Sequence, residues 1–197
     1  MKKSWLLTLA MIATFASGAH AAPGATWVGV NAGIGMPFGE FSDFASTGFN
    51  IGLTTDFVRS ESWAFGGELG WHKFGGNDDL EKSESARLGF PVEFTVRVIP
   101  VTAHAKYLLP ANESVAPFVK GAFGLYNLNF KTDGGAAFES DDSQTKFGFA
   151  IGGGLNFHST ESLAYGAELL YHYISTEEQS SNMITLRGQL LFGIPGQ

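Results

Sequence analysis

The sequence predicts an all-β fold: an eight-stranded antiparallel up-and-down transmembrane β-barrel with an N-terminal signal peptide. Three observations support this prediction. Apolar residues recur at every second position over stretches of roughly ten residues, the length that a tilted strand needs to cross a bilayer. The residues between them are small or polar, and the connections between the stretches are alternately short and long. Transmembrane β-barrels have these features.

The first residues predict a secretory signal peptide over residues 1–21, followed by one mature domain over residues 22–197. Lys2 and Lys3 precede the apolar run LLTLAMIATFA, and the small-x-small site Ala19-His20-Ala21 follows it. This run is shorter than the roughly 18 apolar residues of a membrane-spanning helix. The signal peptide indicates export from the cytoplasm.

The composition of the mature chain excludes several classes of protein. It has no cysteine, which excludes a disulfide scaffold and a lipid-modified cysteine. The net charge of the whole chain is −7, and it becomes about −9 once Lys2 and Lys3 are removed with the signal peptide. Nucleic acid is therefore not an expected partner, because phosphate binding needs a basic face. We expect a monomer.

Eight stretches show the two-residue alternation. They cover residues 28–36, 49–57, 63–71, 94–98, 119–125, 147–157, 163–173 and 184–192. We expect the apolar side of each strand to face lipid, because the small residues opposite suit a narrow lumen. Aromatic residues such as Trp63, Trp71, Tyr171 and Phe192 lie near strand ends, as in the aromatic girdles of membrane interfaces.

The connections alternate in length along the chain. Short connections are predicted at 59–62, 110–114 and 159–162, and long ones at 37–47, 75–92, 131–144 and 175–182. In bacterial outer-membrane barrels the short turns are periplasmic. Both termini are then expected on the periplasmic side.

The fourth stretch departs from simple alternation. Its first polar residues, Glu93 and Arg97, have odd numbers, whereas His104 and Lys106 have even numbers. A β-bulge would shift the facing by one residue, and a proline cannot donate to the strand ladder. We therefore predict a bulge near Ile99-Pro100.

The mature chain as a whole resembles the outer-membrane β-barrel domain proteins, the small eight-stranded barrels of the OmpA/OmpX type. The stretches that carry the likeness are APFVKGAFGLYNL at 116–128, FGFAIGGGLNF at 147–157 and AYGAELLYH at 164–172. The resemblance implies a protein of the Gram-negative cell envelope, set among outer-membrane lipid and lipopolysaccharide. The sequence ends FGIPGQ instead of on the aromatic residue typical of such barrels, a role that Phe192 could take. We expect a barrel alone, without the peptidoglycan-binding domain that some relatives carry.

An internal repeat relates the second and third strands to the sixth and seventh. Residues 48–72 align without gaps to residues 148–172, with identity at 12 of 25 positions. Duplication of a four-strand unit explains this match, and so do the shared constraints on hairpins of a small barrel. The repeat places Glu68 and His72 in correspondence with Glu168 and His172.

The repeated glutamates predict a lumenal ion-pair network. In an antiparallel strand pair, the residue numbers of two opposed residues always add up to the same value, which is twice the number at the centre of the connection. A connection centred near residue 83 places Glu68 opposite about residue 98, and one centred near residue 178 places Glu168 opposite about residue 188. Arg97 and Arg187 are the nearest lumen candidates, so each Glu is expected to pair with an Arg on the next strand. Further polar residues are predicted on the lumen face, namely Lys120, Lys146, Asp56, Thr185 and Gln189.

Two interpretations of this network remain open. An eight-stranded interior is only just wide enough for side chains to fill, which favours a plug that holds the wall together. The alternative is a narrow gated pore for small solutes or ions, in which the pairs exchange partners. His72 and His172 are predicted to be ordinary polar lumen residues, with a shared metal ion as a minor option. No cofactor is expected.

A lipid-modifying enzyme is the third alternative. Such catalysis needs a serine near a histidine that a carboxylate orients. The chain has no G-x-S-x-G motif, and Ser175 beside His172 is the only local pairing. We therefore expect no enzymatic activity.

The long connections carry acidic stretches at 77–84, 139–142 and 176–179. These are expected to be solvated tips, or to bind a surface ligand or divalent cations that bridge to lipopolysaccharide. Phe38, Phe41 and Phe44 in the first long connection suggest packing or a contact surface. Together the features favour a structural or surface-interaction role.

Overall fold

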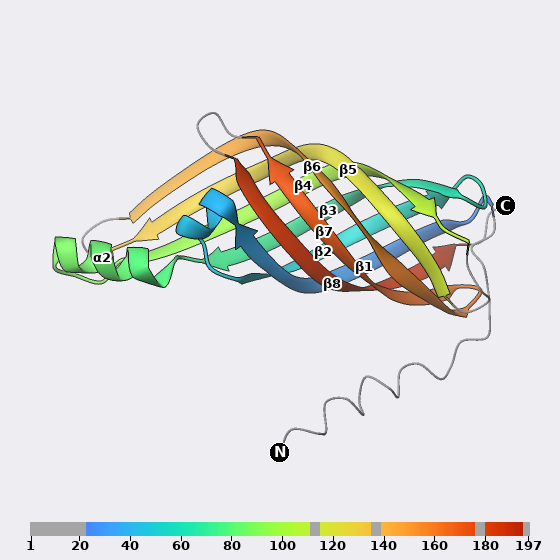
Figure 1. Cartoon of the computed structure of the whole chain (residues 1–197), viewed down its shortest axis with the longest axis horizontal. Coiled ribbons are helices and arrows are strands. Elements are labelled where there is room, and N and C mark those ends of the chain that lie inside the picture. The colour runs from blue at the N-terminus through green and yellow to red at the C-terminus, as the bar shows by residue number, and fades with distance from the viewer. Residues whose placement is uncertain (1–22, 111–114, 135–138, 176–179, 195–197) are drawn as a thin grey trace, which may run out of the picture.

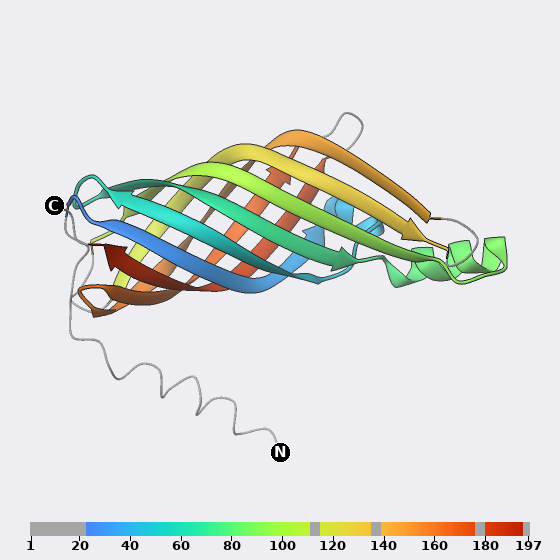
Figure 2. The same ribbon diagram turned by 180° about the vertical axis from the view of Figure 1, so that it is seen from behind.

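The computed structural model describes residues 23–110, 115–134, 139–175 and 180–194, so the predicted signal peptide lies outside the described residues. The chain forms one closed β-barrel (Figures 1 and 2). Its elements are β1 (Thr26–Phe38), η2 (Gly39–Asp43), β2 (Gly48–Val58), β3 (Trp63–Gly75), α2 (Asp78–Leu88), β4 (Glu93–Leu108), β5 (Val115–Asp133), β6 (Glu139–Thr160), β7 (Leu163–Ile174) and β8 (Ser181–Ile194).

Each strand pairs antiparallel with the next, and β1 also pairs with β8. Thr26 lies opposite Ile194 at the end where the described chain begins and ends. Where all eight strands pair, closure leaves no free strand edge, which is a requirement inside a membrane. The predicted eight-stranded antiparallel barrel is confirmed.

The two ends of the barrel differ. The short connections between β2 and β3 and between β6 and β7 lie at one end, here called the turn end, together with the start of β1 and the end of β8 (Figure 1). The opposite end, here called the loop end, carries η2 and α2. There β4, β5 and β6 extend well beyond the other strands, and α2 lies at the tip of this extension (Figure 2).

The apolar side of the wall faces outward. Leu53, Phe123 and Ile151 are 55%, 59% and 56% exposed, while the positions directly before and after each of them are buried or half-buried. Aromatic pairs such as Trp63 with Tyr107, 5.1 Å between ring centroids, lie on this outer face near the turn end. A barrel with this pattern is solvated by lipid on its outside.

The connection at 75–92, predicted as a loop, contains the helix α2. The Asn77 side chain accepts hydrogen bonds from the backbone amides of Asp79 and Leu80, which caps the first turn. Gly89 ends the helix at a φ of 82°, a left-handed conformation that favours glycine. Across the residues that the structure describes, no helix has the length and hydropathy that crossing a membrane requires.

The predicted bulge at Ile99-Pro100 is wrong. Paired positions of β3 and β4 keep one register from Trp63 opposite Tyr107 to Gly75 opposite Thr95. The ladder is only interrupted beside Pro100, which has no amide hydrogen to donate. The register shift that does occur lies between β6 and β7, at His158/Thr160 near the turn end.

One facing therefore holds along the whole of β4, and its even-numbered residues point into the lumen. Val96 and Val98 are buried inside with His104 and Lys106, whereas Arg97 lies on the outer face. The expectation that Glu93 and Arg97 face the lumen is corrected accordingly. The polar residues at the start of β4 lie outside because this part of the strand is close to the loop end.

Replacing Phe123 with Arg tests the direction of the outer face. We expect the free energy of unfolding in phospholipid vesicles to fall by about 2–4 kcal/mol, because a cation would then lie in the hydrocarbon layer. Urea titration followed by tryptophan fluorescence measures this, with Phe123→Leu as the control. An unchanged stability of the Arg variant would mean that this face contacts water.

Candidate functional site: the charged network inside the barrel

Four charged side chains meet at the middle of the lumen. Glu68 comes from β3, Lys120 from β5, Glu168 from β7 and Arg187 from β8, and all four are buried. Arg187 Nη1 lies 2.6 Å from Glu68 Oε1, and Arg187 Nε lies 2.5 Å from Glu168 Oε1. Lys120 Nζ lies 2.7 Å from Glu68 Oε2 and 3.5 Å from Glu168 Oε2. The four groups join opposite walls of the barrel, and we call them the central network.

Arg187 holds this network together. It donates to Glu68 through both terminal nitrogens, since Nη2 also lies 2.7 Å from Glu68 Oε2, and to Glu168 through Nε. Its Nη1 also lies 3.5 Å from the Asn31 side-chain oxygen. A planar guanidinium presents five donors in a rigid fork, so it can serve two carboxylates at once. A lysine at this position could not reproduce both contacts.

A second charged group lies nearer the turn end. Asp56 Oδ1 lies 2.7 Å from His104 Nε2, and Asp56 Oδ2 accepts a hydrogen bond from Lys106 Nζ at 2.7 Å. The Lys106 ammonium also lies 4.9 Å from the centroid of the Phe118 ring, which favours a cation–π contact. We call Asp56, His104 and Lys106 the turn-end triad.

The two groups are neighbours in the strand register. Lys106 of β4 lies directly opposite Lys120 of β5, an arrangement that would be unfavourable if both cations were unpaired. Lys106 binds Asp56, whereas Lys120 binds Glu68. The buried charged residues of the described chain then balance, with three carboxylates and three cations, and this limits the cost of removing each charge from water.

A polar layer lies on the loop-end side of the central network. Tyr126 OH lies 3.2 Å from His172 Nδ1, and Thr185 Oγ1 lies 3.1 Å from His172 Nε2. The rings of His72 and His172 approach edge-on, with 5.9 Å between their centroids. Within the described parts of the chain, no three His, Cys, Asp or Glu side chains form a group that could hold a metal ion.

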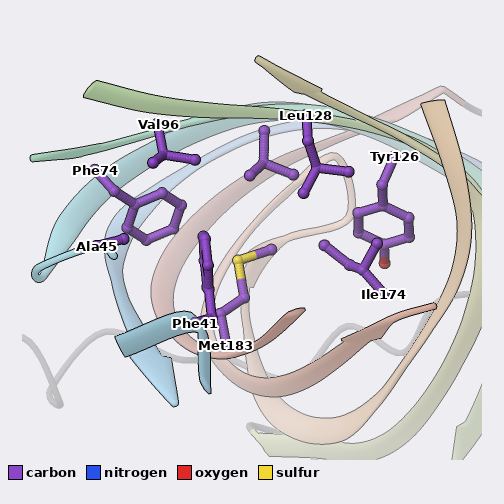
Figure 3. Packing of buried hydrophobic residues seen from close by; sticks show 9 residues of the cluster. Phe41, Ala45, Phe74, Val96, Tyr126, Leu128, Ile174 and Met183 are labelled. Carbon is purple, nitrogen blue, oxygen red and sulfur yellow. The ribbon is translucent and has the colours of Figure 1, made fainter. Parts of the chain in front are cut away.

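An apolar plug fills the lumen beyond this layer (Figure 3). It is a cluster of buried residues, namely Phe41, Ala45, Phe74, Val96, Val98, Tyr126, Leu128, Ile174 and Met183. Phe41 enters from η2 and meets Phe74 edge-on, with 5.5 Å between ring centroids. Phe38 and Phe44 remain exposed, so only one of the three loop phenylalanines belongs to the plug.

The lumen is wider at the turn end. A cavity of about 540 Å³ lies there, and Asp56 and Lys106 are among its lining residues. Trp27, Val58, Ala64 and other apolar side chains also line it. The interior thus contains, in order from the turn end, a cavity, the turn-end triad, the central network, the His172 layer and the apolar plug.

The structure brings some of the predicted site residues together and separates others. It brings together Glu68, Lys120, Glu168 and Arg187, and Glu168 lies directly opposite Arg187, one position from the residue that the loop centre near 178 predicts. The predicted pairing of Glu68 with Arg97 is wrong. Glu68 lies opposite Thr102, because the connection of β3 and β4 is centred near residue 85 and Arg97 faces outward.

Lys146 is half-buried on the lumen side of β6, opposite Tyr126. It lies six residues, roughly 20 Å, from Gly152, which is the partner of Lys120 in the register. This separation places Lys146 beyond the central network. The sequence predicted that His104 and Lys106 face the lumen. It did not predict that both contact Asp56, because Asp56 is far from both residues in the sequence.

The suggested Ser175–His172 pairing does not form. Ser175 is exposed, while His172 is buried in the lumen two strand positions before Ile174. The His172 ring is instead held by Tyr126 and Thr185. The local pairing therefore provides no nucleophile and base in contact.

Comparison with known proteins places this barrel in a family. A family profile described as "Outer membrane protein beta-barrel domain" matches residues 6–189. The chain belongs to this family. Its location is accordingly the bacterial outer membrane, as the sequence predicts. No curated protein matches the sequence.

Solved outer-membrane barrels have the same fold. Neisserial surface protein A has a TM-score of 0.59 and 17% identity, with 86% of this chain and 98% of that chain covered. Ail, the attachment invasion locus protein of Yersinia pestis, has a TM-score of 0.56 and 15% identity, with 86% and 99% covered. At these identities the likeness extends to the fold alone.

The central network predicts that replacing Arg187 destabilises the barrel much more than replacing Arg97. Replacing Arg187 with Met should lower the free energy of unfolding by about 3–5 kcal/mol, because two buried carboxylates would keep only Lys120. Arg97→Met is the matched control, and its effect in zwitterionic lipid should stay within about 0.5 kcal/mol. Urea unfolding of both variants measures this, and equal effects would contradict the network.

The turn-end triad predicts energetic coupling between Asp56 and Lys106. In a double-mutant cycle of Asp56→Asn and Lys106→Met, the coupling energy should exceed about 1 kcal/mol. A parallel cycle of Asp56→Asn with Lys82→Met, on the distant helix α2, should be additive within about 0.5 kcal/mol. If both cycles gave additive values, the buried pair would not stabilise the fold.

Proposed function

We propose that this protein is an integral outer-membrane barrel with a structural or surface-interaction role and a lumen closed by ion pairs. The observation that carries the proposal is the contact of Arg187 with both Glu68 and Glu168, which joins opposite walls across the lumen. The turn end is periplasmic and the loop end faces the outside, as in barrels with short periplasmic turns.

Two barriers in series support a closed lumen. An ion that reached the central network would have to displace Lys120 or Arg187 from buried carboxylates. Breaking one partner from a buried pair costs about 3–5 kcal/mol, so spontaneous opening would be rare. Beyond it, Phe74, Leu128 and Met183 are completely buried in the apolar plug. These three side chains offer no polar group to a hydrated ion.

The loop end supports a surface-interaction role. The extension of β4, β5 and β6 carries α2, whose first turn has three acidic residues at 78, 79 and 81. The relatives named above are by their names a surface protein and an attachment protein. An acidic tip favours a cationic partner or bridging divalent cations.

A narrow gated pore is the second candidate. Lys120 lies between two carboxylates at 2.7 Å and 3.5 Å, so it could exchange Glu68 for Glu168 with a small movement. The turn-end cavity leads to the turn-end triad, which would be the entrance of such a path. The apolar plug is the reason that this function ranks second.

Single-channel recording in planar bilayers separates the two candidates. The closed lumen predicts no reproducible conductance steps for the wild-type protein, nor for the matched outer-face variant Arg97→Ala. Reproducible steps that change in Arg187→Ala and not in Arg97→Ala would establish the pore and overturn the plug.

The lipid-modifying alternative has its own test. Mass analysis of lipid A from cells with and without the protein should give identical spectra if the barrel has no enzymatic role. A mass difference that depends on the protein would replace the structural proposal with an enzymatic one.

A further inference from the structure

The cavity at the turn end contains a buried hydrogen-bond donor that has no acceptor. Trp27 of β1 is 4% exposed and lines this cavity of about 540 Å³. Its indole Nε1 is buried, and none of the residues described accepts a hydrogen bond from it. An indole nitrogen can only donate, and a buried donor without an acceptor costs free energy. An acceptor on a molecule bound in the cavity would remove this cost.

The packing of Trp27 holds its ring in one place. Trp27 lies opposite Gly193 of β8, and a β-carbon at that glycine would lie only 3.1 Å from the indole ring. The ring of His158 meets the indole edge-on, with 5.5 Å between the centroids. On its other side Trp27 lies opposite Asp56 of β2. The donor is therefore fixed beside the turn-end triad, as in a preformed ligand pocket.

The charged groups of the cavity favour a neutral ligand. Lys106 Nζ donates to Asp56 Oδ2 at 2.7 Å, so the ammonium that lines the cavity is already paired. Glu61, in the exposed turn between β2 and β3, adds a negative charge at the rim. An anion would be repelled by Glu61 and by Asp56, and a cation would be repelled by Lys106.

The walls of the cavity are apolar and partly aromatic. Val58, Ala64 and Leu191 belong to one buried apolar cluster with the indole, and all three line the cavity. Aromatic rings pack favourably against other rings edge-on or offset, so Trp27 favours a ligand that contains a ring. The volume lies within the roughly 300–1,000 Å³ that is typical of ligand pockets.

We propose that the turn-end cavity binds a neutral, mainly apolar ring compound with a carbonyl oxygen, such as an aromatic ketone, and that Trp27 Nε1 donates a hydrogen bond to this oxygen. The Lys106 ammonium has two donors besides the one that Asp56 accepts, so it can supply a second contact. The ligand enters from the turn end, because Glu61 and Pro110 at the rim belong to connections at that end.

This binding site is separate from the path across the barrel. The cavity ends at the turn-end triad, and the buried pair of Lys120 with Glu68 lies beyond it. Binding therefore depends neither on conductance nor on closure of the lumen. Its test can fail while the closed-lumen function holds, and the reverse is equally possible.

The indole N–H signals in NMR spectra of the mature, ¹⁵N-labelled protein in detergent micelles test the site. Of the four tryptophans, Trp5 lies in the predicted signal peptide, so Trp27, Trp63 and Trp71 give the remaining signals. Benzophenone should shift the Trp27 signal downfield and saturably, whereas Trp63 on the outer face should report only partitioning into the micelle. Diphenylmethane, which has the same two rings and no oxygen, should bind roughly three- to tenfold more weakly, because one hydrogen bond is lost.

Two variants separate the hydrogen bond from the space. Trp27→Phe keeps a ring and loses the donor, so benzophenone binding, followed at the Ala64 backbone amide, should weaken to the level of diphenylmethane. Ala116→Trp fills the cavity from a half-buried position of β5 and should abolish the saturable Trp27 shift. Trp63→Phe, on the outer face, is the matched control and should bind like wild type.

Four results would overturn the proposal, each with variants that show the heat-modifiable gel band of a folded barrel. The first is a Trp27 signal that benzophenone does not shift saturably. The second is equal affinity for benzophenone and diphenylmethane in the wild-type protein. The third is unchanged binding in Ala116→Trp. The fourth is tighter binding of benzoate than of benzophenone, which would indicate an anion site.

Discussion

The interior of this barrel depends on one guanidinium. Arg187 contacts Glu68 from β3 and Glu168 from β7, and Lys120 from β5 completes the charge balance. Buried carboxylates are tolerated only when cations and hydrogen bonds replace the water that they lose. Four strands are thereby joined through their side chains across the lumen, in addition to the backbone ladders that join neighbours around the wall.

The two copies of the internal repeat contribute to one shared site in the lumen. Its two glutamates do not form two equivalent pairs with arginines on the next strands. Strands β3 and β7 are half a barrel apart, and the lumen is narrow enough for their side chains to meet at a single Arg187. His72 and His172 approach each other in the same way, four residues nearer the loop end than the two glutamates. The repeat therefore supplies two halves of one central cluster.

The outer face of the barrel is apolar, whereas the inner face carries the charged groups. Outside, apolar side chains contact lipid, and the cations Lys73 and Arg97 are confined to the edge of the apolar belt. Inside, the charged groups lie between the turn-end cavity and the apolar plug. Because β4 keeps a single register, Arg97 lies on the outer face and Lys106 lies in the lumen.

The sequence by itself determined the strands, their facing in seven of the eight and the alternation of turns and loops, because period-two patterning and turn length are local properties. It also placed Glu168 close to Arg187 on the next strand, since that pair depends only on the centre of the one connection between these two strands. Only the tertiary structure decided that Glu68 reaches Arg187, that Asp56 binds Lys106 and that Arg97 lies outside. These contacts follow from the closure of the barrel and from the register of β3 with β4 across the connection that contains α2. Closure and register both depend on several strands at once, so the pattern within a single strand does not determine them.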